Sequence, residues 1–324
     1  MGMSFPPVRN MAEISFTLNQ LKRLGIRDIR IAENWKNREP ERGDFNWAPL
    51  ENRIRALGND GLRILLTIQS DGPDWACGAR NSKSCIFTDW SDFENYMEEL
   101  LARVGSELDA IQFGNEWDNQ FVGTARQFLI LQNRFYDLVK KYRPGLDVVL
   151  GGITTRSLLY EAICLNGTRI NQNEYGLQRP IDLNRLITED VCTRQRQSYA
   201  NDLTDVRNML SQARYDIADI HLYDTPDLWD EFMESLGKMT QRPLYATEFG
   251  GPNPDLELRD PAYQALRLSG YLKTISQLPL KRAYYFKLTD GGDAYHDLSG
   301  LFDEKGNPKP ALDVFLKGQA QNPG

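Results

Sequence analysis

The sequence predicts an α/β fold built on a parallel β-sheet, and three observations support this. Short apolar or β-branched runs alternate with longer stretches whose apolar residues recur at three- and four-residue steps. Strands that alternate with helices in this way are typical of a parallel sheet. An open doubly wound sheet is the structural alternative. A Gly-x-Gly-x-x-Gly sequence after a strand would support it, and the chain contains none. With 324 residues, the chain can bury one large core.

Seven strands are clear in the sequence and an eighth is weaker. The weak strand is Gly2–Phe5, and the clear ones are Asp28–Ala32, Arg63–Ile68, Ala110–Gly114, Asp147–Gly151, Ala218–Leu222, Leu244–Thr247 and Arg282–Phe286. Amphipathic helices are predicted between them at Met11–Leu24, Trp90–Val104, Thr124–Tyr142 and Pro261–Ser276, followed by a short helix at Pro310–Lys317. This pattern predicts a single (β/α)8 TIM barrel.

The chain is predicted to be one domain, residues 1–324, because it has no internal repeat, low-complexity segment or interdomain linker. Two long polar loops are expected, one after the third strand at Ser70–Asp89 and one after the fifth from about Gly152 to Asn201. Loops of this length usually have a function.

The composition argues against some classes of partner. The chain is 41% hydrophobic and 26% charged, with a net charge of −7. An acidic chain of this kind does not favour nucleic acid or an anionic membrane surface. No apolar run reaches the roughly 18 residues that a membrane helix needs. We therefore expect neither nucleic acid nor a membrane as a partner, and we expect a monomer.

The four cysteines fall into two local pairs, each in a long polar stretch. We expect Cys77 to bond Cys85 and Cys164 to bond Cys192; free buried thiols are the alternative. No Cys-x-x-Cys occurs, so a zinc ribbon is not expected. Disulfides favour a location outside the cytosol. We therefore expect an extracellular or periplasmic protein whose leader is absent from this sequence.

The residues that close the strands are the most informative ones, because the active site of a parallel barrel lies at the carboxyl ends of its strands. Side chains alternate between the two faces of a strand. The apolar face packs on the helices, so the polar face points into the barrel. This alternation predicts that five side chains gather at the barrel mouth: Arg30, Gln69, Glu116, His221 and Glu248.

Two carboxylates at a barrel mouth suit the cleavage of a glycosidic bond. One carboxyl group must be protonated to donate to the leaving oxygen, and the other must be ionised to attack the anomeric carbon. Arg30 beside Glu248 would keep that carboxylate charged. Asn115 suits a hydrogen bond to the sugar 2-hydroxyl. Flat apolar faces for pyranose rings are offered by Trp35, Trp75, Trp117 and Trp229.

These residues resemble those of the clan A glycoside hydrolases, nearest to families 39 and 5, and the resemblance covers nearly the whole chain. Glu116, in the pair Asn115-Glu116 after an apolar strand, resembles the acid/base of the clan, and Glu248 resembles its nucleophile. Further matches are Arg30 on the second strand, His221 and Tyr223 on the sixth, the segment Glu39–Trp47, and the C-terminal runs Gly300–Asp303 and Pro308–Ala311.

The resemblance implies a retaining glycoside hydrolase that cleaves β-glycosidic bonds of a poly- or oligosaccharide through a covalent glycosyl-enzyme. Retention implies that the two carboxyl groups lie about 5–5.5 Å apart. We expect no cofactor, and no metal because the two histidines are far apart in the sequence.

The chain departs from the clan at two strand ends. It has Tyr285-Phe286-Lys287 where many members have a tryptophan, and Gln69 where family 5 often has a histidine. Both departures affect the contacts with the sugar more than the catalytic pair. Phe286 and Lys287 are therefore added to Trp35 and Trp117 as candidate substrate-binding residues.

Two other functions stay open. A carbohydrate-binding barrel without turnover would explain the aromatic residues but not both carboxylates together with Arg30. A different barrel enzyme, such as an aldolase or a phosphate-site isomerase, would need an interior lysine, for which Lys287 is a candidate, or a phosphate loop, for which Gly250-Gly251-Pro252 is poor. Taken singly, His221, Lys287 and Asp290 also fit structural roles.

Overall fold

The structure is a computed structural model that describes residues 1–175, 181–251, 260–292 and 295–321. Its main sheet contains eight strands in the order β7-β6-β3-β2-β1-β10-β9-β8. These strands are β1 (Gly2–Ser4), β2 (Asp28–Glu33), β3 (Arg63–Ile68), β6 (Ala110–Phe113), β7 (Asp147–Val149), β8 (Ala218–Tyr223), β9 (Leu244–Gly250) and β10 (Arg282–Tyr285).

The end strands of this order are joined as well. Val149 of β7 forms a parallel bridge with Ile217, the residue before β8. The order then follows the chain around a ring, and the paired strands run parallel. The fold is therefore an α/β TIM barrel, which confirms the fold class expected from the sequence.

Contacts along the chain define two compact units, which we describe separately. The N-terminal unit comprises Gly2–Ile153 with Gln212–Asp219, and the C-terminal unit comprises Thr154–Ser211 with Ile220–Gly324 and Met1.

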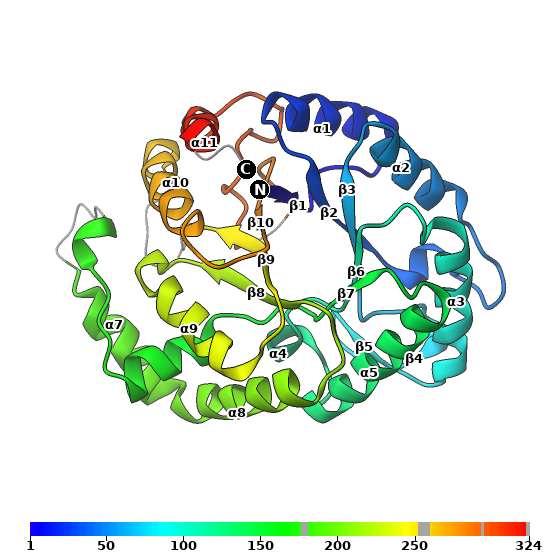
Figure 1. Ribbon diagram of the computed structural model, residues 1–324, viewed down its shortest axis with the longest axis horizontal. Helices are drawn as coiled ribbons and strands as arrows, with labels where there is room; N and C mark the ends of the chain where they lie inside the picture. Colours follow the sequence, from blue (N-terminus) through cyan, green and yellow to red (C-terminus); the bar gives the residue numbers. More distant parts are fainter. Residues whose placement is uncertain (176–180, 252–259, 293–294, 322–324) are drawn as a thin grey trace. The chain divides into compact units, whose positions relative to one another are not determined.

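Helices lie outside the strands in the N-terminal unit (Figure 1). They are α1 (Met11–Arg23), α2 (Ala48–Asn59), α3 (Trp90–Val104), the short α4 (Trp117–Gln120) and α5 (Ala125–Tyr142). Local signals fix their starts: the Asn10 side chain accepts from the Glu13 N–H, and Thr124 with Gln127 forms a capping box. Strand β2 is buried along almost its whole length, as expected of a parallel strand covered on both faces.

The loop after β3 is more ordered than its polar sequence suggested. It contains a short 3-10 turn, η2 (Asp74–Ala76), and an antiparallel hairpin of β4 (Cys77–Arg80) and β5 (Cys85–Phe87). The expected disulfide between Cys77 and Cys85 joins the two hairpin strands.

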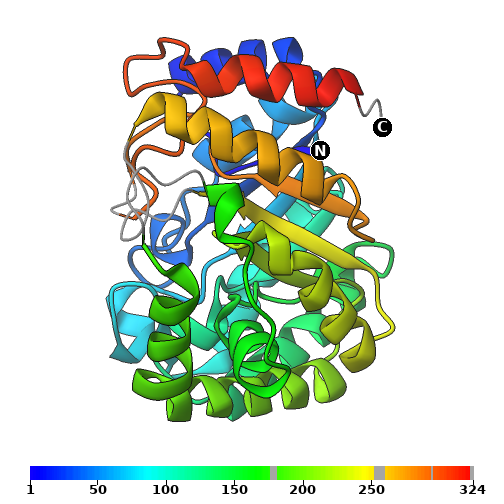
Figure 2. The ribbon, with the colours of Figure 1, turned by 90° about the vertical axis from the view of Figure 1, so that its left-hand side faces the viewer.

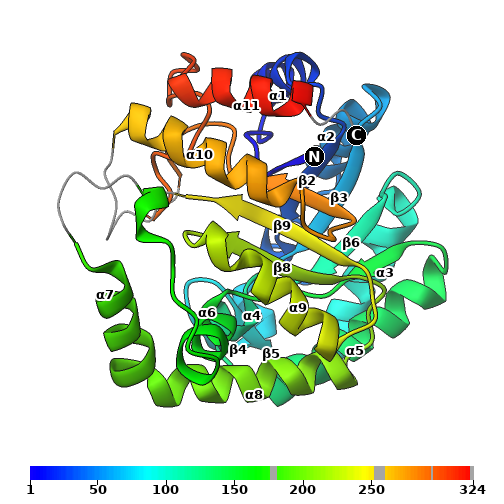
Figure 3. The same cartoon turned by 60° about the vertical axis from the view of Figure 1, so that its left-hand side comes forward.

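In the C-terminal unit, which contains β8 from Ile220 onward, β8, β9 and β10 are followed by helical segments. The later ones are η6 (Pro226–Leu228), α9 (Trp229–Met239), α10 (Pro261–Ile275) and α11 (Pro310–Gln321). Helices α10 and α11 lie side by side, as Figure 2 and Figure 3 both show. Each of these two begins with a proline at its first residue, where the missing N–H costs nothing.

The stretch expected to be one irregular loop, Gly152–Asn201, is largely helical instead. It contains α6 (Arg156–Leu159), η3 (Tyr160–Leu165), η4 (Gln172–Tyr175), α7 (Leu183–Glu189), η5 (Asp190–Arg194) and the start of α8 (Arg196–Gln212). The pieces before α8 are too short to show a helical period in the sequence. The expected disulfide Cys164–Cys192 joins η3 to η5, beside a small apolar cluster of Tyr160, Val191 and Leu203.

Among the described residues, no helix combines the length and the apolar character that crossing a membrane would need.

Candidate active site

A buried hydrogen-bond network centred on Arg30 runs toward the carboxyl end of β6. Arg30 is 0% exposed. Its Nη2 donates to Gln112 Oε1 at 2.8 Å and to Asn115 Oδ1 at 2.7 Å, and its Nε donates to Thr67 Oγ1 at 3.0 Å. Because these partners come from neighbouring strands, Arg30, Thr67 and Gln112 share one face of the sheet, as the alternation in the sequence predicts.

Gln112 connects the hydrogen-bond network of Arg30 to the carboxyl group of Asp219. Its Nε2 donates to Asp219 Oδ2 at 2.6 Å and to the Leu150 carbonyl at 2.9 Å. Since the amide nitrogen must make these bonds, the amide oxygen faces Arg30, and the orientation of Gln112 is fixed by chemistry. The Arg30 guanidinium and the Asp219 carboxyl group are thus linked through the amide of Gln112.

Glu116 lies where the chain turns sharply between β6 and α4. Gly114 has φ 72° and Glu116 has φ 45°, both in the left-handed region. A Cβ on Gly114 would lie 2.9 Å from the Phe128 ring, so this position requires glycine. The Glu116 carboxylate is half-buried, and its Oε2 accepts from Gln120 Nε2 at 2.7 Å and from Asn119 Nδ2 at 3.5 Å.

Glu248 lies near the end of β9 in the C-terminal unit and is 5% exposed. Its Oε2 accepts a hydrogen bond of 2.6 Å from the Tyr223 hydroxyl, and His221 Nδ1 lies 3.5 Å from the same oxygen. The other ring nitrogen of His221 lies 3.1 Å from Thr247 Oγ1. The alternation of β8 therefore brings His221 and Tyr223 to the same carboxylate.

Aromatic rings surround Tyr223 in this unit. The His296 ring stacks on it with centroids 4.3 Å apart and an interplanar angle of 16°, and Phe286 meets it edge-on at 6.4 Å. Sequence reasoning missed His296, because it lies in the loop after β10, where no strand period points to a face. The available signal was that it is one of only two histidines in the chain.

Two polar residues that follow β10 stabilise the loop that contains His296. Lys287 is buried, and its Nζ donates to the Gly291 carbonyl and lies 5.3 Å from the centre of the Phe286 ring. Asp290 pairs with Lys309 at 2.8 Å and accepts from the Gly300 N–H, also at 2.8 Å. These contacts favour the structural alternative for Asp290.

Three of the predicted tryptophans are packed in the core. Trp35 is 0% exposed, stacks on Tyr96, and donates from its indole nitrogen to Glu39 at 2.6 Å. Trp229 is also 0% exposed, and Trp117 is 4% exposed. A ring that is fully covered cannot stack on a sugar, so we leave Trp35 out of the proposed site.

Two other candidates lie nearer the surface of the N-terminal unit. Trp75 is half-buried, with the Arg42 guanidinium 4.8 Å from the centre of its ring. Gln69 is half-buried just after β3, and within the described part of the chain its side chain makes no hydrogen bond.

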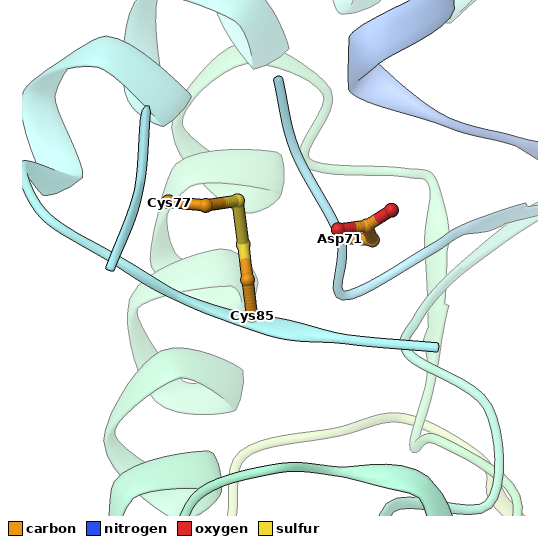
Figure 4. Close-up of side chains that lie close together, drawn as sticks. All are labelled: Asp71, Cys77 and Cys85. Atoms are coloured by element: carbon orange, nitrogen blue, oxygen red, sulfur yellow. A yellow bond between two sulfur atoms is a disulfide. The ribbon is translucent and has the colours of Figure 1, made fainter. Parts of the chain in front are cut away.

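Asp71 lies near the Cys77–Cys85 disulfide in a grouping that resembles a set of metal ligands (Figure 4). The two sulfurs are bonded to each other, so neither is a thiolate that can bind a metal. The Asp71 carboxylate instead binds Lys36 at 2.8 Å and Arg80 at 3.0 Å. Burial alone would raise the pKa of Asp71, but the hydrogen bond and charge of Lys36, with the charge of Arg80, outweigh it and lower the pKa.

No protein-family profile and no curated protein matches this sequence. Solved structures do share its fold. An exo-β-1,4-mannosidase from Opitutaceae bacterium strain TAV5 superposes with a TM-score of 0.68 at 17% identity, over 99% of this chain and 59% of the mannosidase chain. The present chain therefore spans less than two thirds of that protein.

Two further similar structures belong to the families that the sequence resembles. GH5_18 from Streptomyces cattleya, solved in complex with GlcNAc, gives a TM-score of 0.70 at 14% identity, over 99% of this chain and 79% of that one. A family 39 glycoside hydrolase from Bacteroides cellulosilyticus WH2 gives 0.61 at 16% identity, over 99% and 64%. At these identities the comparison establishes the shared barrel fold.

Proposed function

We propose that this chain is a retaining glycoside hydrolase that cleaves β-glycosidic bonds in a poly- or oligosaccharide by double displacement. The observation that carries the proposal is the buried Glu248 carboxylate, which accepts a 2.6 Å hydrogen bond from Tyr223 at the end of a barrel strand. A carboxylate held in one orientation at a strand end is what a nucleophile in this fold needs.

Glu248 is the proposed nucleophile and Glu116 the proposed acid/base. The Tyr223 hydroxyl donates to Glu248 Oε2 and so orients the carboxylate. In the double displacement, Glu248 Oε attacks the anomeric carbon while Glu116 gives its proton to the leaving oxygen. Glu116 then removes a proton from the water that releases the sugar from Glu248.

Asn115 is proposed to bind the sugar 2-hydroxyl. Its Oδ1 accepts from Arg30, so the amide cannot be flipped and the Nδ2 donor points away from that guanidinium. Arg30 therefore acts as a positioning residue for Asn115. The pairing of Arg30 with Glu248 that the sequence suggested stays a prediction.

Sugar contacts are proposed for Tyr223, Phe286 and Lys287 beside Glu248, and for Gln69 in the N-terminal unit. The rings of Tyr223 and Phe286 support an aromatic wall against the glycone. The glycosidases of the same fold act on, or were solved with, sugars, which supports a carbohydrate as the substrate.

We also propose that the chain acts as one catalytic domain outside the cytosol, in the extracellular space or the periplasm. The two disulfides support this location, because disulfides are rare in reducing compartments.

A pair of variants tests the roles of the two carboxylates. Glu116→Ala should keep much activity on an activated aryl glycoside and little on a natural glycan, whereas Glu248→Ala should lose both. Added azide should give a glycosyl azide of retained configuration with Glu116→Ala and of inverted configuration with Glu248→Ala.

The opposite stereochemistry would reverse the two assignments. If the wild type releases no sugar from a panel of polysaccharides but still binds one of them, the alternative of a carbohydrate-binding barrel is correct.

A further inference from the structure

The Glu116 carboxylate of the N-terminal unit is held by a residue one helical turn further along the chain. Gln120 closes α4, and its Nε2 donates to Glu116 Oε2 at 2.7 Å, while its backbone N–H donates to the Glu116 carbonyl, also at 2.7 Å. Asn119 reaches the same carboxylate oxygen only at 3.5 Å. Gln120 therefore orients the Glu116 carboxylate through Oε2.

Gln120 is in turn attached to the β4–β5 hairpin. Its carbonyl accepts from Ser84 Oγ at 2.9 Å and from Asn81 Nδ2 at 3.0 Å. The same Ser84 oxygen accepts from the Val122 N–H at 2.8 Å. Ser84 is 0% exposed, so water does not compete for these bonds.

The hairpin itself is closed at several points. Cys77 and Cys85 form a disulfide across it, and Asn81 Oδ1 accepts from the N–H groups of Lys83 and Ser84 at 2.8 Å each. The hairpin also packs closely on the chain after α4, because a Cβ on Gly123 would lie 2.7 Å from Ile86 Cδ1. A helix of four residues is too short to be stable by itself, so α4 depends on these tertiary contacts with the hairpin.

We propose that Gln120 is a positioning residue for Glu116, and that the disulfide-bonded β4–β5 hairpin holds Gln120 through Ser84 and Asn81. The inference rests on the proposed function, in which Glu116 protonates the leaving group. A general acid contributes only when its proton is aimed at the leaving oxygen, and small displacements reduce the rate strongly.

The test is the dependence of kcat/KM on the leaving group, since kcat/KM reports the first, glycosylation step. Gln120→Met keeps the length of the side chain and removes the donor. On aryl glycosides of the sugar that the wild type releases, kcat/KM should fall by roughly 10- to 100-fold with a phenyl leaving group and stay within about threefold with 2,4-dinitrophenyl. A general loss of structure would lower both equally.

Gln197→Met is the matched control. Gln197 is an exposed glutamine in α8 whose amide donates at 3.0 Å to Asn201, four residues away, so the same substitution removes the same kind of bond. Gln197→Met should leave kcat/KM unchanged on both aryl glycosides. Equal losses on the two leaving groups with Gln120→Met, or no loss on phenyl, would overturn the proposal.

The hairpin is tested with two further pairs of variants. Ser84→Ala should reproduce the phenyl-selective loss, whereas Ser211→Ala, which removes an exposed hydroxyl bonded to the Asn208 carbonyl, should not. The double variant Cys77→Ser/Cys85→Ser should also give the selective loss, and Cys164→Ser/Cys192→Ser should give none. If both cysteine pairs behave alike, the hairpin does not position Glu116.

Failure of this inference can be told apart from failure of the proposed function. Glu116→Ala must itself show the leaving-group dependence. If it does not, Glu116 is not the acid and the proposed function is wrong. If it does while Gln120→Met and Ser84→Ala do not, only the positioning role is wrong.

Discussion

Tyr223 is the side chain that most directly orients Glu248. Its hydroxyl donates to Oε2 at 2.6 Å. Its ring is held by stacking on His296 and by the edge of Phe286. The Tyr223 hydroxyl thus orients the proposed nucleophile from a ring that has little freedom.

Removal of this hydroxyl gives the first prediction. Tyr223→Phe keeps the ring but removes the 2.6 Å hydrogen bond to Glu248 Oε2, and a hydrogen bond to a carboxylate contributes about 1.5–3 kcal/mol. We expect kcat/KM to fall by roughly 10- to 100-fold with little change in the melting temperature. Tyr142→Phe, at the end of α5, is the control and should keep full activity. A Tyr223→Phe enzyme as active as the wild type would show that Tyr223 does not position Glu248.

The residues that the sequence placed at the site differ from those it missed in one physical respect. Arg30 and His221 stand on strands, where the two-residue period assigns a face. Gln120 and His296 stand in a short helix and a loop, where no period exists and only the tertiary contacts decide the direction of a side chain. Trp35 was misleading because aromatic residues suit both a sugar and a core, and the sequence does not distinguish the two.

At the scale of the element, sequence patterns predicted some boundaries to the residue. Arg63–Ile68 and Trp90–Val104 match β3 and α3 because apolar periodicity and a cap or turn residue coincide there. Helix α8 was missed because it buries only a narrow apolar face, made of Leu203, Val206, Met209 and Leu210. Its remaining surface is polar, and in the sequence such a helix resembles a loop.

Asp71 connects elements of the N-terminal unit. Burial raises the pKa of its carboxyl group, but Lys36 and Arg80 lower it by more, so the net shift is downward. A lowered folded-state pKa stabilises the fold at pH values above the ordinary value of 3.8, and this stabilisation is lost as the pH falls through the folded-state pKa. Asp71→Asn should therefore lower the melting temperature at pH 7 by roughly 2–4 °C, and the difference should shrink as the pH falls through the lowered pKa of Asp71.

Asp60→Asn, at an exposed site at the end of α2, is the control and should leave the melting temperature unchanged at both neutral and low pH. The predicted loss is modest because Lys36 and Arg80 are partly exposed, and solvent weakens their attraction to the carboxylate. An equal loss from Asp71→Asn at low and neutral pH would show that the carboxylate charge is not the cause.

The pKa of Asp202, on α8, is shifted in the opposite direction to that of Asp71. Burial raises the pKa of its carboxyl group, and Arg156, 3.5 Å away, reduces the effect without reversing it. A raised folded-state pKa gives stability that is complete below the ordinary value of 3.8 and is lost as the pH rises through the folded-state pKa. Asp202→Asn should therefore raise the melting temperature at pH 7 by roughly 2 °C and lose this advantage at low pH. Calorimetry at the two pH values checks it, and a lower melting temperature at pH 7 would contradict it.

At the scale of the whole molecule, the barrel was predictable because its evidence is spread along the chain. Eight strands alternating with helices leave few other folds, and the strand order around the sheet agrees with that prediction. The two proposed catalytic carboxylates belong to different compact units, Glu116 to one and Glu248 to the other. Neither unit alone contains the proposed pair.

Retention of configuration tests whether both carboxylates act on the same glycosidic bond by double displacement. In a double displacement the anomeric centre is inverted twice, which needs both carboxylates to act on one bond at a separation of about 5–5.5 Å. We expect the wild type to release the β-anomer first from an aryl β-glycoside, with the α-anomer growing in later by mutarotation, as followed by proton NMR within the first minutes. A larger separation, of about 6.5–9.5 Å, admits a water molecule and gives the α-anomer first. That result would keep both carboxylates catalytic but change Glu248 from nucleophile to general base, so the measurement decides between two mechanisms that the same residues support.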